Sequence, residues 1–145
     1  MEEAPRQRRK TLSVSEANAL LPDVTRLVQQ LQGLQQSIVQ TNRQLDDVIG
    51  KLASGNGFPI QSLKDQIQAL TRHQLQLIEA FQSALKQLED LGGVLKDLNM
   101  GLVDFYSLRQ DKTVFLCWTL GEERIGFWHT LEEGLSGRHP LDTPA

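Results

Sequence analysis

Apolar side chains recur at alternating steps of three and four residues along two stretches of the chain. The first stretch covers residues 24–52, with Thr41 as its one polar member, and the second covers residues 60–91. This spacing is typical of the seam of a coiled coil, in which one apolar stripe of each helix faces a partner. We therefore predict two long helices, over residues 14–53 and 60–91.

The start of the first helix carries a recognisable capping sequence. Ser13 and Glu16 have the spacing of a capping box, in which each side chain bonds the backbone N–H of the other residue. Pro22 follows soon afterwards, and proline disfavours helical geometry at the residue before it. We expect a short helix over residues 14–20, a bend, and a long helix that starts near Pro22.

The segment ASGNGFP, residues 53–59, separates the two heptad stretches. Its glycines, asparagine and proline favour a turn, so the two helices should form an antiparallel hairpin. Further apolar residues lie off the seams and need a cover, either from the carboxy-terminal part or from a second copy of the chain. They are Leu20, Leu21, Val28, Val39, Ile49, Leu75, Ile78 and Leu85.

The pattern changes after Gly92-Gly93, which is typical of a helix end. Short runs rich in β-branched and aromatic residues follow, separated by turn residues, and they predict an antiparallel β-meander over residues 94–129. The run at 114–120 is apolar on both faces, which favours a central strand. Residues 130–145 should be irregular. The predicted fold class is α+β, a long coiled-coil-like αα-hairpin followed by a small β-meander cap.

Composition and charge indicate the compartment of the protein and the classes of partner that it does not bind. Residues 1–10 are basic and poor in apolar side chains, so we expect a flexible tail before one domain at 11–145. The net charge is −3, no apolar run approaches the ~20 residues of a membrane span, and Cys117 is the one cysteine. We predict a cytoplasmic protein that binds no membrane, and the acidic balance argues against nucleic acid.

Reactive side chains gather in the carboxy-terminal third, although no established catalytic or cofactor motif is present. Asp97, Asp104 and His129 could hold a divalent metal, or Asp104 could be satisfied structurally by hydrogen bonds from a turn or by pairing with Arg109 or Arg138. Trp118 and Trp128 could form an aromatic cage or simply belong to the core. The ligand candidates are Asp97, Asp104, Glu122, His129, Arg138, Trp118 and Trp128. Cys117, among apolar neighbours, should be a buried, unreactive thiol.

Several segments together resemble a known family. LSVSEANALLP, GLVDF, VFLCWTLGEERIGFWH and GLSGRHPL are similar to a bacterial family, the domain-of-unknown-function family numbered 2203. The resemblance covers residues 11–141, although Tyr106 stands where the family pattern has a proline. It implies the fold but no established activity. The positions that match the family motif are Asp104, Cys117, Trp118, Glu122, Trp128, His129 and Arg138.

The sequence favours a protein-interaction or assembly module that acts through the helical hairpin, with a homodimer or a helical protein as the partner. The alternative is a protein that binds a metal or a small ligand through the acidic and histidine residues of the β-cap. An enzyme with His129 as general acid or base, oriented by Asp104, ranks below both. Nucleic-acid binding through residues 6–10 ranks last. No catalytic residue and no resident cofactor is predicted.

Overall fold

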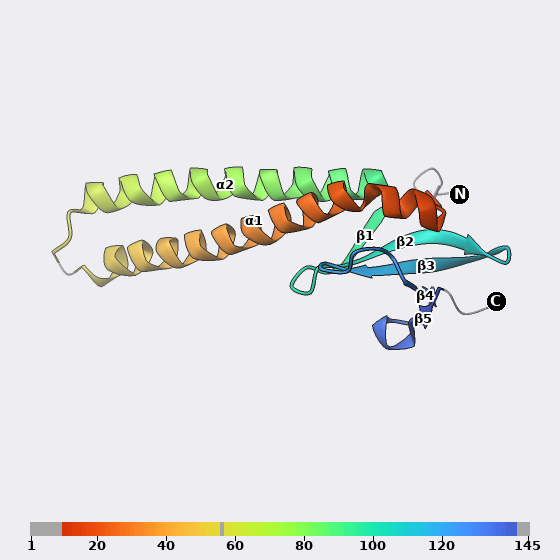
Figure 1. Cartoon of the computed structure of the whole chain (residues 1–145). Coiled ribbons are helices and arrows are strands. Elements are labelled where there is room, and N and C mark those ends of the chain that lie inside the picture. The colour runs from red at the N-terminus through yellow and green to blue at the C-terminus, as the bar shows by residue number, and fades with distance from the viewer. Residues whose placement is uncertain (1–9, 56, 142–145) are drawn as a thin grey trace, which may run out of the picture. The chain divides into compact units, whose positions relative to one another are not determined.

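The computed structural model describes residues 10–55 and 57–141 (Figure 1). Two helices, α1 (Val14–Ser54) and α2 (Ile60–Leu91), pack together and precede a sheet of five antiparallel strands. The predicted α+β class is confirmed. Of the predicted basic tail, residues 1–9 lie outside the described residues, whereas Lys10 donates a hydrogen bond from Nζ to the Asp90 carbonyl (3.3 Å).

Helix α1 begins with the predicted capping box. The Ser13 N–H donates to Glu16 Oε1 (2.8 Å), and the Glu16 N–H donates to Ser13 Oγ (3.0 Å). The predicted division into a short helix over residues 14–20 and a long helix from Pro22 is wrong, because α1 continues through this residue as one helix. Proline inside a helix costs about 3 kcal/mol through its missing N–H and its ring. Leu21 and Val24, on either side of it, are both buried, and this burial offsets the cost.

The sheet is a meander in which each strand pairs with the next one along the chain. Its order is β1 (Gly93–Asp97), β2 (Leu102–Arg109), β3 (Lys112–Thr119), β4 (Phe127–Thr130) and β5 (His139–Pro140). Strand β3 is central and buried on both faces, as its apolar pattern predicts.

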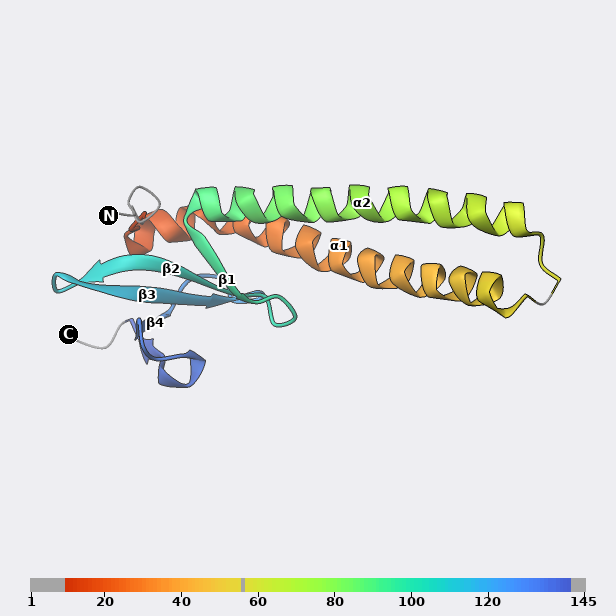
Figure 2. The ribbon, with the colours of Figure 1, turned by 180° about the vertical axis from the view of Figure 1, so that it is seen from behind.

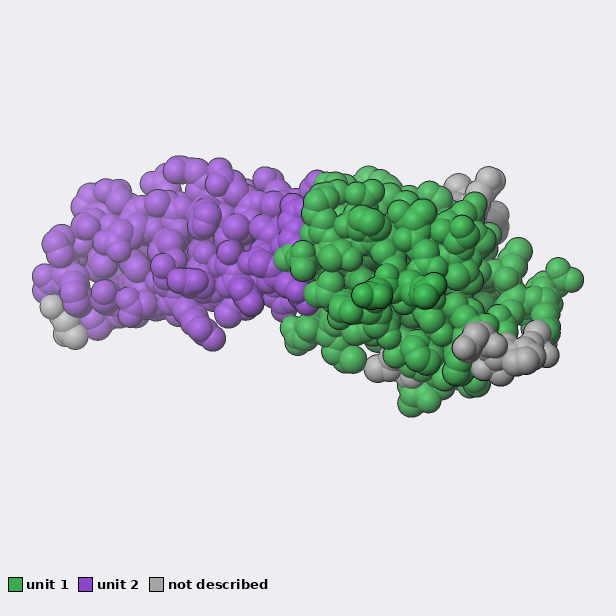
Figure 3. Space-filling view, viewed as in Figure 1, with its two compact units in different colours: residues 1–29, 86–145 green, residues 30–85 purple. Residues whose placement is uncertain are grey.

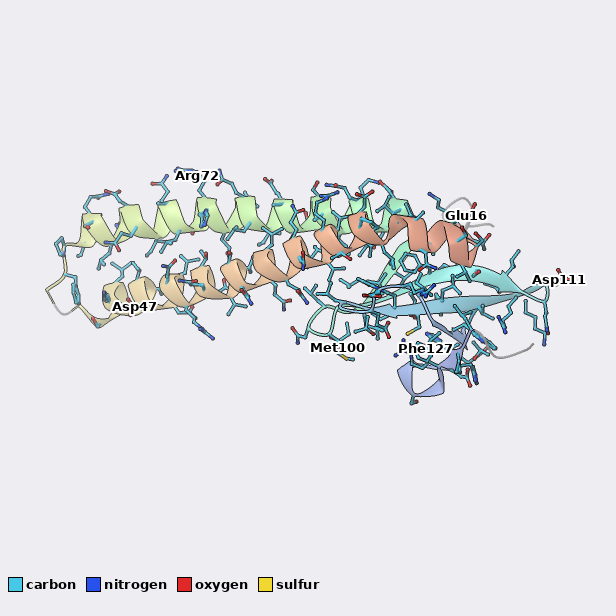
Figure 4. The ribbon with its side chains drawn as sticks, in the orientation of Figure 1. Glu16, Asp47, Arg72, Met100, Asp111 and Phe127 are labelled. Atoms are coloured by element: carbon cyan, nitrogen blue, oxygen red, sulfur yellow. The ribbon has the colours of Figure 1, made fainter. Side chains whose placement is uncertain are left out.

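The turn between β2 and β3 fixes their register. It has two residues, Gln110 and Asp111, with φ of 54° and 68°, and Figure 4 shows Asp111 at its tip. Positive φ at both central residues is typical of the tight turns whose twist matches paired strands. Arg109 therefore faces Lys112, and each earlier residue of β2 faces a later residue of β3.

The segment predicted as an irregular tail contains regular structure. A 3-10 helix (Leu135–Gly137) leads into β5, which pairs with β4. The Leu141 N–H also donates to the Gly126 carbonyl (2.9 Å). A two-residue strand that contains a proline gives almost no sequence pattern, and proline is tolerated because β5 is an edge strand.

The chain divides into two compact units, which Figure 3 colours separately. The first unit comprises residues 1–29 and 86–145, and therefore holds the start of α1, the end of α2 and the sheet. Figures 1 and 2 both show the start of α1 beside β2. The Ile125 N–H donates to Asn18 Oδ1 of α1 (2.8 Å). The fully buried side chains of this core include Val24, Leu27, Val28, Leu88, Val103, Phe105, Leu116 and Trp118.

The second unit, residues 30–85, is an antiparallel pair of helical segments. Its seam includes Thr41, whose hydroxyl donates to the Ser37 carbonyl (2.8 Å) and is thus satisfied within its own helix. Across the pair, Gln74 bonds both the Asn42 side chain and the Ile38 carbonyl. Among the described residues, no helix combines the length and apolar character that a membrane span requires.

Candidate functional site

Three buried polar side chains meet on one face of the sheet. Asp104 on β2 lies directly opposite Cys117 on β3, and Cys117 lies opposite Phe127 on β4. His129 is two residues beyond Phe127, so alternation along the strand brings it to the same face. The exposed fractions are 2% for Asp104, 0% for Cys117 and 3% for His129. We call these three residues the Asp–Cys–His cluster.

Both ring nitrogens of His129 are engaged. Nδ1 lies 2.8 Å from the Thr130 carbonyl oxygen, and Nε2 lies 3.0 Å from Asp104 Oδ2. A carbonyl oxygen can only accept, so Nδ1 must carry a proton and donate it. The proton between Nε2 and Oδ2 then resides either on the imidazole or on the carboxyl group. The two side chains therefore share this proton in one hydrogen bond.

Burial dominates the electrostatics of Asp104. Desolvation raises the pKa of this carboxyl group, and the nearby charges of His129 and Lys96 counteract the rise in part. The second carboxyl oxygen, Oδ1, is buried and has no N–H or O–H donor within residues 10–55 and 57–141, although the Cys117 thiol also hydrogen-bonds the Asp104 carboxyl group. A buried carboxyl oxygen without a partner is costly, and native proteins usually satisfy such an atom with a donor, a water or an ion.

Cys117 lies in the same apolar surroundings. Burial first, and then the charge of Asp104, raise the pKa of its thiol to about 11. Arg138 opposes this rise, whereas Glu122 adds to it. The thiol is therefore protonated near neutral pH and weakly nucleophilic on its own, as predicted for a buried cysteine.

Lys96 on β1 is a positive charge at the margin of the cluster. Its Nζ lies 3.8 Å from Asp104 Oδ2 and 4.3 Å from the centroid of the Phe115 ring. Its side chain is 38% exposed, so the ammonium group is partly solvated and Lys96 can change its position more readily than the buried residues.

The donor set of the cluster suits a divalent transition metal. A carboxylate oxygen, a thiolate sulfur and an imidazole nitrogen are the ligand types that zinc uses, and here they all lie within 4.8 Å of one another. Two donors bound to a tetrahedral zinc stand roughly 3.3–3.8 Å apart, so the cluster would need to contract by no more than about 1.5 Å. The Nδ1–H bond to the Thr130 carbonyl also leaves Nε2 as the ligating nitrogen, which is the usual arrangement at metal sites.

Two of the three predicted metal ligands, Asp104 and His129, come together in this cluster. Asp97 does not join them: its Oδ1 accepts the Met100 N–H in the turn after β1 (3.0 Å). The structural alternative paired Asp104 with Arg109 or Arg138. In the structure, the ion-pair partners of Asp104 are His129 and Lys96 instead.

Glu122 and Arg138 form a pair of their own. Arg138 Nη2 lies 3.2 Å from Glu122 Oε2, and the Arg138 guanidinium group lies 3.8 Å from the centroid of the Phe127 ring. Glu122 Oε1 also accepts the Thr119 N–H (2.8 Å), which anchors the loop after β3. The charges of Glu122 and Arg138 shift the pKa of the Cys117 thiol, but neither residue belongs to the Asp–Cys–His cluster.

The two tryptophans have separate environments. Trp118 is 1% exposed and donates from Nε1 to the Glu122 carbonyl (3.0 Å), so it is a core residue and offers no open face to a ligand. Trp128 is half-buried, and its ring lies 4.6 Å from the ring of His139. The burial of Trp118 favours the core interpretation over an aromatic cage built from both tryptophans.

The sequence interpretation assigned Cys117 to the core and missed its place beside Asp104. The register between β2 and β3 would have revealed this position. Once Gln110 and Asp111 are recognised as a two-residue hairpin turn, residues of β2 and β3 that face each other have numbers that sum to 221, and Asp104 and Cys117 satisfy this rule.

The fold and the cluster define an α+β protein with a helical hairpin, a five-stranded meander and a buried Asp–Cys–His group on that sheet. The chain belongs to the family described as uncharacterized conserved protein DUF2203, whose model matches residues 10–141. This match confirms the resemblance seen in the sequence. Searches of curated proteins and of solved structures found no match.

Proposed function

We propose that this protein binds one zinc ion, or a similar transition metal, through the Asp–Cys–His cluster. The observation that carries the proposal is the convergence of three buried donors, a carboxylate, a thiol and an imidazole, within 4.8 Å of one another. An ion held by all three donors would give the Asp104 carboxylate a positively charged partner. Mixed oxygen, nitrogen and sulfur donors match the preferences of zinc.

Metal binding would replace protons in the cluster. The raised pKa values of Asp104 and Cys117 favour the protonated forms when no metal is present, and a ligating thiol must lose its proton. Binding should therefore release protons and strengthen as the pH rises. A reducing compartment, as the lone cysteine suggests, would keep the thiol available.

The burial of the cluster favours a structural role over a catalytic one. The three donors come from three adjacent strands, so an ion would tie β2, β3 and β4 together. A general base needs a ring nitrogen that reaches the substrate, whereas both nitrogens of His129 bond protein atoms and the residue is 3% exposed. Hydrolytic or proton-transfer chemistry at His129 is accordingly disfavoured.

Equilibrium dialysis of the full chain against zinc chloride tests the proposal. We expect one bound zinc per chain in the wild type and at least about 100-fold weaker binding in Cys117→Ala, which removes a direct ligand. The matched control is Asp97→Asn, which removes an acidic side chain that lies outside the cluster. Less than stoichiometric zinc, or equal binding by wild type and Cys117→Ala, would contradict the proposal.

A second candidate function, self-association through the hairpin, rests on a different observation. Of the apolar residues off the seams, Leu21 and Val28 are buried in the first unit. In the second unit Val39, Ile49 and Leu75 are 41%, 47% and 56% exposed. We infer that a second copy of the chain covers these side chains, because two amphipathic hairpins bury their apolar faces as a four-helix arrangement.

Sedimentation equilibrium distinguishes a dimer from a monomer. We expect a dimer in the wild type and a shift to monomer when Val39, Ile49 and Leu75 are all changed to serine. A matched triple variant of exposed polar residues on the same helices, Gln40→Ser, Lys64→Ser and Arg72→Ser, should remain dimeric. A wild type that is monomeric at high concentration would remove this function and leave the metal proposal untouched.

A further inference from the structure

Lys96 is the residue at which the pairing of β1 with β2 becomes irregular. The register shifts between Leu95 and Asp97, so Lys96 has no residue of β2 opposite it. An extra residue of this kind forms a β-bulge, and a bulge changes the direction in which a side chain points. At this bulge the Lys96 ammonium group lies at the margin of the Asp–Cys–His cluster, 3.8 Å from Asp104 Oδ2.

The contacts of Lys96 place a cation at the carboxylate without fixing it there. Asp104 Oδ2 is the oxygen that bonds His129 Nε2 at 3.0 Å, whereas its distance to Lys96 Nζ is too long for a hydrogen bond. The ammonium group also lies 4.3 Å from the centroid of the Phe115 ring. Because the Lys96 side chain is partly exposed and Asp104 is buried, the cation can move outward into water while the carboxylate stays in place.

A metal ion and the Lys96 ammonium group are alternative partners for one negative charge. In the metal-free cluster the ammonium group lies beside the Asp104 carboxylate and stabilises its ionised form. A divalent ion bound by this carboxylate and by the Cys117 thiolate would be neutralised by these two ligands, so Lys96 would lose its partner. Two cations that approach the same carboxylate also repel each other strongly inside a protein. The ammonium group and the ion therefore exclude each other at Asp104.

We propose that Lys96 takes the place of the metal ion at Asp104 in the metal-free protein and moves out to solvent when the ion binds. Lys96 then sets the metal affinity of the cluster although it is not a ligand. This role rests on the metal binding proposed above and identifies the group that the ion must displace. Removal of the Lys96 charge should therefore strengthen metal binding, whereas removal of a ligand weakens it.

Zinc titrations of the full chain, in competition with a chromophoric chelator, measure this effect. We expect Lys96→Met, which keeps the length of the side chain and removes its charge, to bind zinc at least about tenfold more tightly than the wild type. Lys96→Arg retains the charge and should not bind zinc more tightly than the wild type. The matched control is Lys86→Met on α2, which removes an exposed lysine 3.4 Å from Asp90 and should leave the zinc affinity unchanged.

Acetylation of the wild-type lysines, followed residue by residue with mass spectrometry, tests the displacement without any variant. Saturating zinc should raise the acetylation rate of Lys96 at least about threefold, because the amine loses its partner and becomes more exposed. Lys51, which lies 3.3 Å from Asp47, and Lys86 pair with exposed aspartates on the helices. Their acetylation rates should not change with zinc, so they serve as internal controls.

Failure of this role and failure of metal binding give different results. A wild type that binds no zinc would remove both. Stoichiometric zinc in the wild type, together with equal or weaker binding by Lys96→Met, would overturn the role of Lys96 and leave the metal site standing. A Lys96 acetylation rate that zinc leaves unchanged or lowers would do the same, because the ammonium group would then have stayed at the cluster.

Discussion

Removal of His129 should cost far more stability than neutralisation of Asp104, although the two residues share one hydrogen bond. His129→Ala leaves a buried carboxyl group whose remaining close charge, Lys96, is 3.8 Å away, and it opens a cavity among residues that are 0–4% exposed. Breaking a buried pair from one side costs about 3–5 kcal/mol. Asp104→Asn keeps the shape, and its amide can donate to His129 Nε2, so we expect a cost of about 1 kcal/mol.

The assay is urea and thermal unfolding in the presence of a metal chelator, followed by tryptophan fluorescence. Both tryptophans belong to the unit that contains the sheet, so the signal reports the unfolding of the cluster's own surroundings. For a chain of this length about 3 °C of Tm corresponds to 1 kcal/mol, so His129→Ala should melt roughly 10–15 °C below the wild type. His73→Ala, on the exposed face of α2, is the matched control and should change stability by no more than about 0.5 kcal/mol.

Two outcomes would refute this reasoning. If Asp104→Asn destabilised the protein as much as His129→Ala, the charged form of Asp104 would be essential and the neutral hydrogen bond would not substitute for it. If His129→Ala unfolded within about 1 kcal/mol of the wild type, the cluster would not be buried in the way its exposed fractions indicate.

Three further predictions concern other parts of the fold. Burial raises the pKa of the Cys117 thiol to about 11 in the folded chain, from 9.0 in the unfolded chain. The stability that the protonated thiol contributes is therefore fully present below pH 9, and the free energy of unfolding falls by about 1 kcal/mol per pH unit above it. Cys117→Ala should remove this slope in urea titrations at pH 8–10.5, and an unchanged slope would refute the assignment. Gly101→Ala should lower the free energy of unfolding by about 1–3 kcal/mol, because φ is +72° and the new Cβ would lie 2.5 Å from Leu120 Cβ. The control Gly126→Ala, whose new Cβ meets nothing within 4 Å, should be nearly neutral. Equal melting temperatures of the two variants would contradict this prediction. Ser13→Ala should cost about 1 kcal/mol by thermal unfolding through loss of the cap, and no change in Tm would show that the box contributes nothing.

The helices could be predicted from the sequence because one periodic signal extends over many residues. Each heptad seam specifies both an element and the face that it buries, and α1 and α2 follow those seams closely. The error at Pro22 has a local cause. A helix-breaking residue predicts the end of a helix by itself, whereas the burial of Leu21 and Val24 on both sides keeps α1 continuous. Tertiary burial of this kind cannot be read from one position.

The site was only half predictable for a different physical reason. Asp104 and His129 could be found because polar residues in apolar strand runs need partners. Cys117 carries no such signal, since a cysteine in an apolar run looks like any small core residue. Its role depends on register, and a shift of one residue would turn it to the opposite face. Asp97 was chosen for its chemistry, but the turn after β1 uses its carboxylate for a backbone N–H.

The central claim, that Asp104, Cys117 and His129 bind one metal ion together, is tested most directly by the absorption spectrum of the cobalt-substituted protein. Cobalt(II) replaces zinc in sites of this donor set and gives an intense near-ultraviolet band only when a thiolate binds it. We predict that this band saturates at one cobalt per chain, disappears in Cys117→Ala and persists in Asp97→Asn. A wild-type spectrum without the thiolate band, or one that survives in Cys117→Ala, would contradict the account.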